Sequence, residues 1–473
     1  MNLEHGKGKI GVIALTLLIA GAIDSIRNLP ATALFGSTLI FFFIFSALVF
    51  LIPAALVSAE LTSTNTEEGG IFVWVRSALG NHVGFLAIWL QWINTMIWYP
   101  TILSFIAGTL TYFVDPALAQ DKMYLISVIL IVFWIMTVIN LKGLSLSSHV
   151  ASFCAIVGMI VPMGLIITLA AIWIFSGNPI HVSFTAANML PSLSHTDNWI
   201  SLTAIMTAFL GMELATVHVK EVRNAQKNFP KALIFAVILI LITMIAGALS
   251  IAIVLPQNKI DLVDGVMQAF SAFLNAYHLH WMTPVLVVMI LLGSLGSMIN
   301  WIISPAKGLF QAAEQGYLPA GLAKKNSKNV PANILILQAI LVSVLCLVFL
   351  LMPSVNGSYW LLTDLSTQLY MFMYVLMFIA ALVLKHRPHH VSRATFLIPG
   401  KKLGGWITCL LGLLGCTLTI IVGFFPPASL NVGGAAHYEI VFTTGLIVMS
   451  LPALLGLLYK TLKTITPGKT QLD

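Results

Sequence analysis

The sequence predicts an all-α membrane protein with twelve transmembrane helices. Hydrophobic residues make up 59% of the 473 residues and charged residues only 8%, whereas soluble domains carry about 25% charged residues. The apolar runs are long and continuous and do not alternate as the strands of a membrane barrel do. Because a chain in lipid must pair its backbone groups within helices or a closed barrel, these runs predict a helical bundle.

Twelve runs are apolar over about 20 residues, the length that spans a bilayer. We number them as spans one to twelve in chain order. The expected spans are 10–34, 37–61, 82–113, 122–141, 149–176, 198–218, 231–255, 281–312, 331–352, 358–384, 403–424 and 438–459.

The basic residues predict which ends of the spans face the cytoplasm. The chain has 23 Lys and Arg residues and a formal net charge of +7. With a cytoplasmic N-terminus, all but three fall at the inner face; Lys122 and Lys259 fall outside and Arg27 falls within the first span. Inner loops of membrane proteins carry this excess. The distribution argues against a nucleic-acid-binding protein, in which basic residues form a patch on a soluble face.

This topology divides the chain into two groups of five spans and a final pair. No cleavable signal peptide is evident, and the four cysteines lie in apolar runs, where we expect buried hydrophobic residues and not disulfides or metal ligands. The expected segments are a cytoplasmic N-terminus (1–9), a first inverted repeat (10–176), a periplasmic loop (177–197), a second inverted repeat (198–384), a cytoplasmic loop (385–402), spans eleven and twelve (403–459) and a cytoplasmic tail (460–473).

Two spans carry ionisable residues beside glycine or proline, and an ionisable residue within hydrocarbon marks function by default. The first span contains Gly21-Ala22-Ile23-Asp24-Ser25-Ile26-Arg27-Asn28-Leu29-Pro30, and the sixth contains Gly211-Met212-Glu213-Leu214-Ala215. We expect both helices to be broken there, which a membrane tolerates only where the backbone lines a cavity. Breaks five spans apart fit two inverted five-helix repeats with a binding site between them.

An interrupted helix offers peptide groups of both polarities to a ligand. The helix N-terminus after a break suits a carboxylate, and the carbonyl groups before a break suit an ammonium group. An amino acid zwitterion carries both groups, so the predicted ligand is an amino acid. The residues expected to bind it at the breaks are Ile23, Asp24, Ser25, Ile26, Arg27, Gly211, Met212, Glu213 and Leu214.

Structural roles stay open for the three charged residues at the breaks. Asp24 and Arg27 are three positions apart and would share one face of an unbroken helix, where they could form an ion pair. Glu213 could be a buried carboxyl group that bonds to the break and never touches the substrate.

Four groups of residues carry a resemblance to a known family. They are Ile52-Pro53, Ser58-Ala59-Glu60-Leu61, Glu67-Glu68-Gly69-Gly70-Ile71-Phe72-Val73-Trp74-Val75 and Ala78-Leu79-Gly80; Gly211-Met212-Glu213, His218-Val219-Lys220-Glu221, Asn224 and Pro230; Trp301 and Pro305-Ala306-Lys307-Gly308; and Val383-Leu384-Lys385-His386. Together they resemble the amino acid–polyamine–organocation (APC) transporters, especially the bacterial glutamate/GABA antiporter branch. The likeness extends over about residues 10–460.

The resemblance implies a fold and an activity. The fold would be the LeuT-like bundle of ten core helices in two inverted five-helix repeats, with two peripheral helices. The activity would be exchange of one amino acid for another by alternating access across a bacterial inner membrane. In the antiporter branch glutamate enters and GABA leaves, which links the exchanger to a cytoplasmic amino acid decarboxylase and to acid resistance.

The resemblance also adds three aromatic residues to the candidate site. It implies that Trp301 of the eighth span caps the pocket, and that Tyr370 and Tyr374 of the tenth span line it. The four-residue spacing of the tyrosines independently places both rings on one helix face. Ordinary helix packing is the alternative for all three side chains.

This sequence also departs from the antiporter branch. Arg27-Asn28-Leu29-Pro30 stands where that branch has tyrosines and a glutamate, and Ser297 stands where it has a glutamate. If Arg27 faces the site, it can hold a second carboxylate with two parallel hydrogen bonds, which favours an acidic substrate. The branch's C-terminal plug, which closes the antiporter at neutral pH, has no counterpart here, so that form of gating is not expected.

Proton- or sodium-coupled symport is the alternative to exchange. Span 149–176 has no Lys, Arg, Asp or Glu, so it lacks the lysine that replaces sodium in proton-coupled relatives, and exchange is favoured. Ser294 and Ser297 could supply oxygens to a sodium ion, although small residues in membrane helices more often make packing contacts. His218 could titrate in an acidic compartment, with a structural role as the alternative.

A membrane enzyme, a channel and a receptor fit the sequence poorly. An enzyme needs clustered carboxylates, metal-ligating histidines or a nucleophile with its base. Only the Glu67-Glu68 pair comes near this, and His389-His390 has no acidic partners nearby. A channel needs rings of polar residues, and a receptor needs a sizeable soluble output domain. We therefore expect no catalytic residue, metal ligand or cofactor, and the expected partners are amino acid substrates and the lipid bilayer.

Overall fold

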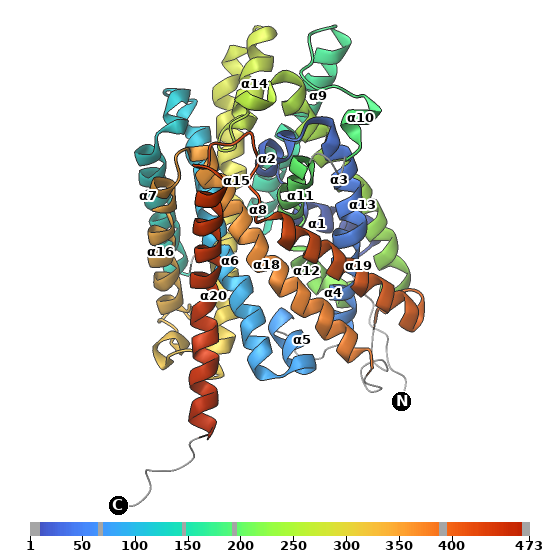
Figure 1. Cartoon of the computed structure of the whole chain (residues 1–473), viewed down its shortest axis with the longest axis vertical. Helices are drawn as coiled ribbons and strands as arrows, with labels where there is room; N and C mark the ends of the chain where they lie inside the picture. The colour runs from blue at the N-terminus through green and yellow to red at the C-terminus, as the bar shows by residue number, and fades with distance from the viewer. Residues whose placement is uncertain (1–9, 65–69, 144–147, 192–195, 387–394, 466–473) are drawn as a thin grey trace, which may run out of the picture.

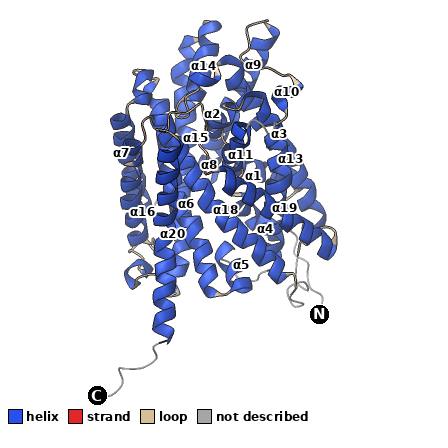
Figure 2. Ribbon diagram, viewed as in Figure 1, coloured by secondary structure: helices blue, strands red, loops and turns tan. Residues whose placement is uncertain are grey.

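The computed structural model describes residues 10–64, 70–143, 148–191, 196–386 and 395–465. Over these ranges the chain forms helices and no strand, and a single isolated bridge pairs Ile10 with Val222. Figure 2 shows the helices side by side in one bundle. The predicted all-α class is confirmed for this part of the chain.

The first half of the chain forms ten α-helices and five short 3₁₀ or π segments within the described ranges. They are α1 (Val12–Ile23), η1 (Ile26–Asn28), α2 (Leu29–Ala33), η2 (Gly36–Thr38), α3 (Leu39–Ser46), η3 (Ala47–Leu51), α4 (Ile52–Thr64), α5 (Gly70–Leu79), α6 (Asn81–Thr111), η4 (Pro116–Gln120), α7 (Lys122–Leu141), α8 (Ser148–Ala155), η5 (Ile156–Ile160), α9 (Val161–Phe175) and α10 (Ala186–Met189).

The second half has a similar composition of elements. They are η6 (Thr196–Ile200), α11 (Ser201–Ala208), α12 (Met212–Ala215), η7 (Thr216–Glu221), α13 (Ala225–Val254), η8 (Gln257–Lys259), α14 (Gly265–Ala276), η9 (His280–Met282), α15 (Thr283–Glu314), η10 (Ala320–Ala323), α16 (Ala332–Leu345), α17 (Val348–Leu351), α18 (Val355–Leu384), α19 (Lys401–Val422) and α20 (Ala435–Ile465).

Ten segments of the described chain are long and apolar enough to cross a bilayer, if the bent pair Val12–Ile23 and Ile26–Ala33 counts as one. They correspond to ten of the twelve expected spans. The third expected span is α6, a helix of 31 residues that includes the polar residues Gln91 and Asn94. The sixth is divided among α11, α12 and η7. The full count of twelve and the inverted repeat stay predictions.

The outward faces of the long helices are apolar, as lipid requires. On α13, Ile234, Ile238 and Ile242 are 58%, 49% and 61% exposed, and their four-residue spacing places them on one face. Ile407 and Leu414 are exposed on α19 in the same way. Exposed apolar surface of this extent marks contact with other apolar material, which fits a multi-pass membrane protein.

The interior is built around α6 and α18, which pack along each other. Trp92 of α6 and Trp360 and Tyr374 of α18 are fully buried. The helix pair α7 and α16 forms one edge of the bundle, and α1, α11 and α12 lie near its centre (Figure 1). The four cysteines are buried and free, as predicted.

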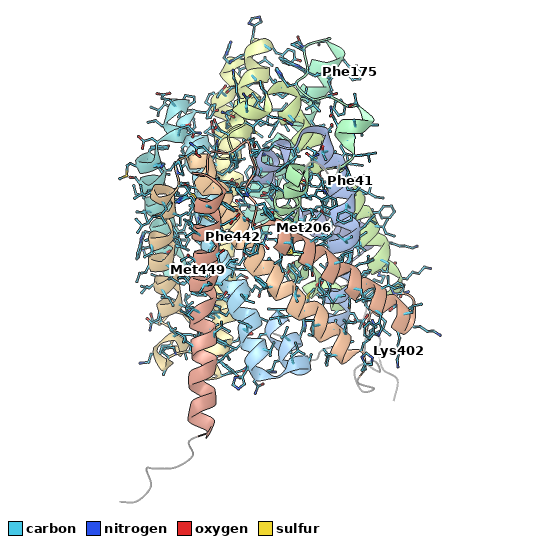
Figure 3. All side chains as sticks on the ribbon, in the orientation of Figure 1. Phe41, Phe175, Met206, Lys402, Phe442 and Met449 are labelled. Atoms are coloured by element: carbon cyan, nitrogen blue, oxygen red, sulfur yellow. The ribbon has the colours of Figure 1, made fainter. Side chains whose placement is uncertain are left out.

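The bundle has two distinct ends. One carries α14, and Phe175 at the end of α9 lies there as well; the other carries Lys402 and the last turns of α20 (Figures 1 and 3). We call them the α14 end and the Lys402 end.

The predicted break in the first span is present. The helix α1 ends at Ile23, and Asp24 and Ser25 have extended backbone with ψ angles of 125° and 119°. The chain then forms η1 and α2, bent by 42° from α1. Pro30 lies in the first turn of α2, where its missing amide hydrogen costs no helical hydrogen bond, so it favours the start of a new helix after the break.

The predicted break in the sixth span is present too. The helix α11 ends at Ala208, and α12 starts after Gly211, whose φ of 92° lies in the left-handed region. Glycine adopts this conformation without the steric cost that a side chain brings. The glycine of the predicted motif is therefore the residue at which the chain turns.

Candidate functional site

Both breaks line one cavity of about 170 Å³ inside the bundle. Drug-sized ligands occupy pockets of about 300–1,000 Å³, so this cavity suits a smaller molecule. Its walls are Gly21, Ala22, Ile23, Asp24, Ser25, Arg27 and Asn28 from the first break; Asn94, Thr95, Trp98 and Ile102 from α6; Thr207, Ala208, Leu210 and Gly211 from the second break; and Met159, Trp301 and Tyr370.

Arg27 is a buried cation with neutral partners. Its Nη1 donates to Thr101 Oγ1 at 3.0 Å and to Tyr359 Oη at 3.2 Å. Its guanidinium carbon lies 5.4 Å from the ring centroid of Trp98, where a cation–π attraction operates. A guanidinium has five N–H donors, so donors remain for a ligand in the cavity that Arg27 lines.

Asp24 bonds to α13 and not to Arg27. Its Oδ2 accepts a hydrogen bond from Thr243 Oγ1 of α13 at 2.7 Å, and no described residue bonds to its buried Oδ1. No ion pair joins these two described residues, so the alternative of an Asp24–Arg27 pair is wrong for this structure. The extended backbone at Asp24 and Ser25 separates the two side chains that an unbroken helix would have aligned.

Glu213 lies behind the cavity, in a buried hydrogen-bond network. Its carboxylate accepts from the hydroxyl groups of Tyr370 and Tyr374 of α18 and from Gln91 Nε2 of α6 at 2.8 Å. The Gly211 amide donates to Tyr374 Oη at 3.2 Å. Glu213 is 2% exposed and does not line the cavity. The network ties the second break to α6 and α18.

The predicted aromatic residues divide into two groups. Trp301 and Tyr370 line the cavity and also line a smaller pocket beside it toward Leu214. Trp301 lies against Trp98, with ring centroids 5.6 Å apart. Tyr374 is fully buried against Phe50 and does not reach the cavity.

Three more of the predicted residues lie outside the main cavity. Ile26 and Met212 are 4% and 0% exposed and pack into the core. Leu214 lines only the adjoining pocket. Of the twelve predicted residues, the structure therefore brings Ile23, Asp24, Ser25, Arg27, Gly211, Trp301 and Tyr370 to one cavity.

Sequence reasoning missed the residues that hold the charged groups. Thr101, Tyr359 and Thr243 are polar residues within long helices and bond to Arg27 or Asp24. The only signal in the sequence was that polarity, which many packing residues share. Gln91 was also missed, although a side-chain amide in the middle of a membrane helix is expected to have a hydrogen-bond partner.

The residues that could couple transport to an ion, the alternative to exchange, are only partly described. The side chains of Ser297 and His218 lie outside the described part of the structure. Among the described residues, no group of three or more His, Cys, Asp or Glu side chains is placed to hold a metal ion. A larger pocket of about 680 Å³ between α11, α19 and α20 is lined mainly by apolar residues and lies away from both breaks.

Two interrupted helices that meet at a small cavity with charged residues in its wall, within a bundle of apolar helices, define a multi-pass membrane transporter. The comparisons with known proteins agree. The family model for amino acid permeases matches residues 10–448, and the chain belongs to this family, which is part of the APC superfamily.

Three relatives cover between 80% and 94% of the chain. An uncharacterised transporter of Legionella pneumophila is 40% identical over 94% of this chain and 96% of its own length. A glutamate/gamma-aminobutyrate antiporter of Lactococcus lactis is 30% identical over 94% of this chain and 89% of its own. A probable agmatine/putrescine antiporter of Lactococcus lactis is 24% identical over 80% of this chain and 79% of its own.

Proposed function

We propose that this transporter exchanges an acidic amino acid, such as glutamate, for an internal amino acid or its decarboxylation product, such as GABA. The proposal rests on Arg27. A guanidinium that is 6% exposed, with neutral hydrogen-bond partners and a cavity beside it, is expected to attract an anionic group. Arginine binds carboxylates with two parallel hydrogen bonds, and a buried cation gains most when such a partner arrives.

The other end of the substrate would meet Asp24. Its Oδ1 is buried without a partner, and an ammonium group would supply the missing donor. The peptide groups of the first break would bind the α-carboxylate, because the amides that open η1 have no acceptor within that turn. We therefore propose Asp24 for the amino group, the Ser25–Ile26 backbone for the α-carboxylate and Arg27 for the side-chain carboxylate.

This assignment accounts for both members of the exchanged pair. Glutamate and GABA share an ammonium group and the carboxylate at the far end of the chain, and they differ in the α-carboxylate. Both would therefore bind Asp24 and Arg27. Only glutamate would also use the backbone amides of the first break.

Topology is part of the same proposal. The excess of Lys and Arg predicted for the inner face, together with Lys402 at the end where α20 finishes (Figure 3), supports a cytoplasmic Lys402 end and an external α14 end. The breaks in spans one and six support the inverted 5+5 repeat. Within this arrangement Trp301 would close the cavity toward the smaller pocket that it also lines.

The test is counterflow in proteoliposomes. Liposomes loaded with glutamate, GABA, glutamine or arginine, or left without amino acid, are given labelled glutamate outside. We expect uptake to rise several-fold when the interior holds glutamate or GABA, and to stay near the empty-liposome level with arginine.

Two results would overturn exchange of an acidic substrate. Equal uptake into empty and loaded liposomes, driven by a proton or sodium gradient, would establish the symport alternative. No uptake of labelled glutamate from any interior, together with uptake of labelled arginine into arginine-loaded liposomes, would assign the cavity to a cationic substrate.

A further inference from the structure

The loop of residues 260–264, between α13 and α14, is buried except at Asp261, although it lies at an end of the bundle. Leu262 and Val263 are fully buried and Asp264 is 3% exposed. The chain enters α14 directly after this loop, at the α14 end in Figure 1. Burial of a carboxyl group in a loop at the end of a helical bundle is energetically unfavourable unless the group is bonded or protonated.

The two carboxyl groups of the loop are bonded unequally. Asp261 accepts from Asn356 Nδ2 at 2.8 Å and from the Gln268 amide, so each of its oxygens has a donor. Asp264 Oδ2 accepts from Tyr112 Oη at 2.9 Å. Asp264 Oδ1 is buried, and no described residue bonds to it.

This environment disfavours the charged form of Asp264. Burial, the larger cause, and the neighbouring Asp261 carboxylate together raise the pKa of Asp264 to about 7, and the Tyr112 hydrogen bond opposes the shift. An ordinary aspartate has a pKa of about 3.9. The value of about 7 lies where the pH outside a bacterial cell varies.

Few other charges can influence Asp264. Asp261 and Tyr112 are the titratable groups that act on it. The helix α2, the first turn of α14 (265–268) and the first turn of α18 (355–358) contain no titratable residue, and Lys259 in η8 is exposed. Protonation of Asp264 is thus controlled locally.

We propose that Asp264 is a proton-binding site through which the compartment at the α14 end regulates the substrate cavity. The protonated side chain fits the packed loop. Loss of the proton places two neighbouring carboxylates in a buried loop, which loosens its packing on the helices that it contacts.

Those helices are the ones that hold Arg27. Gly108 of α6 packs so closely on Val263 and Asp264 that a Cβ added there would lie 2.6 Å from Val263 and 3.2 Å from Asp264. Thr101, which bonds to Arg27, lies seven residues earlier on α6, or about two turns.

The loop is also connected to Arg27 through α18 and through α2, over similarly short distances along each helix. Asn356, which bonds to the loop, lies one turn before Tyr359 on α18. A Cβ added to Gly265 would lie 3.0 Å from Pro30 of α2, and α2 follows Arg27 after Asn28. Loosening of the loop is therefore transmitted to Arg27 through three helices, and the affinity for the acidic substrate falls.

The first experiment measures folding and does not depend on transport. A group whose pKa is raised in the folded state stabilises the fold below its unfolded pKa and loses that contribution as pH rises to its folded pKa. The window here runs from about 4 to about 7. The thermal midpoint of Asp264→Asn minus that of the wild type should increase as the pH rises from 5 to 7. Above pH 7 we expect this difference to stay constant.

The second experiment measures the pH midpoint of transport, and this arm rests on the proposed exchange. The apparent KM for external glutamate is measured with external pH varied from 5.5 to 8.5 and internal pH fixed. The glutamate side chain titrates near 4.3, below this range. We expect KM to rise several-fold with a midpoint near pH 7, and Asp264→Asn to keep the low-pH KM throughout.

Two neighbouring substitutions give shifts of opposite sign, which a merely structural role of the loop does not produce. Asp261→Asn removes a negative charge and moves the midpoint to lower pH, and Tyr112→Phe removes a donor to the ionised form and moves it to higher pH, each by on the order of one pH unit or less. Glu439→Gln, an exposed carboxyl at the start of α20, leaves the midpoint unchanged.

The outcomes separate this proposal from the proposed function. If no amino acid is exchanged but the thermal midpoint of Asp264→Asn behaves as expected, the proton site stands and the substrate assignment fails. A midpoint near pH 7 that survives in Asp264→Asn, or identical shifts in Asp261→Asn and Tyr112→Phe, overturns the proton site.

Discussion

The hydroxyl group of Tyr359 lies 3.2 Å from Nη1 of Arg27 and joins α18 to the break in the first span. Thr101 makes the corresponding contact from α6 at 3.0 Å. Two neutral hydroxyl groups position the cation without neutralising it. The charge at this point in the cavity is therefore held in place and stays available to a ligand.

Replacement of Arg27 is expected to act on acidic substrates selectively. A hydrogen bond to a charged group contributes about 1.5–3 kcal/mol, so Arg27→Gln should reduce kcat/KM for glutamate by about 10- to 100-fold. Uptake of glutamine should fall far less. Arg27→Lys should be intermediate, because lysine keeps the charge and lacks the planar fork.

The control is Lys142→Gln, which removes an exposed cation at the end of α7. It should leave both substrates unaffected. An equal loss of glutamate and glutamine uptake in Arg27→Gln would assign Arg27 a structural role.

The tyrosines that bond to Glu213 should separate stability from substrate binding. Tyr370 lines the cavity and Tyr374 does not, although both hydroxyl groups bond to the same carboxylate. Loss of a buried hydrogen-bond partner costs about 1–3 kcal/mol. Tyr374→Phe should therefore lower the thermal midpoint and preserve KM, whereas Tyr370→Phe should change both.

Glu213→Gln tests the same network from its centre. The amide nitrogen cannot accept a hydrogen bond, so one tyrosine loses its acceptor and the thermal midpoint should fall. Glu314→Gln, at an exposed position at the end of α15, is the matched control. An unchanged midpoint in Glu213→Gln would mean that the network contributes little to folding.

The breaks could be predicted from the sequence because their causes are local. Pro30 favours the start of a new helix at α2, and Gly211 adopts a backbone conformation that glycine favours. Charge next to these residues inside apolar runs marked the same positions. A signal of this kind can be recognised within a window of about ten residues, without knowledge of the rest of the fold.

The orientation of the charged side chains could not be predicted in the same way. The partners of Arg27 are 74 and 332 residues away in the chain, and the partner of Asp24 is 219 residues away. Glu213 was expected at the cavity, and in the structure it bonds to α18 and α6 behind it. These contacts depend on how distant helices pack, which residue spacing within one helix does not specify.

Gly211→Ala should show the cost of the second break's backbone. An L-residue in the left-handed conformation costs about 1–2 kcal/mol, and a Cβ at Gly211 would meet the Trp301 ring at an ordinary contact distance of 3.9 Å. Backbone strain, and not a clash, should therefore lower the thermal midpoint and the transport rate. Gly21→Ala is the control, because Gly21 lines the same cavity and a Cβ there would contact nothing within 4 Å.

A second glycine contrast tests how closely the fifth and eighth spans must approach. Gly158 lies in the π segment η5 and packs on Gly293 of α15, where an added Cβ would lie 2.2 Å from the Gly293 Cα atom. The atoms that this Cβ would meet belong to the backbone of α15 and cannot rotate away. Gly158→Ala must therefore push the two helices apart. Overpacking of this kind costs about 1–3 kcal/mol, measurable as a lower thermal midpoint of the purified protein.

Gly164→Ala on α9 makes the same chemical change six residues later in the same span, where an added Cβ would contact nothing within 4 Å. Alanine is favoured over glycine in a helix by about 1 kcal/mol, so this variant should be as stable as the wild type or more so. The expected order of thermal midpoints is Gly164→Ala, wild type, Gly158→Ala. If Gly158→Ala is as stable as Gly164→Ala, the two helices are not in the close contact that the glycine pair indicates, and the packing of η5 on α15 is wrong.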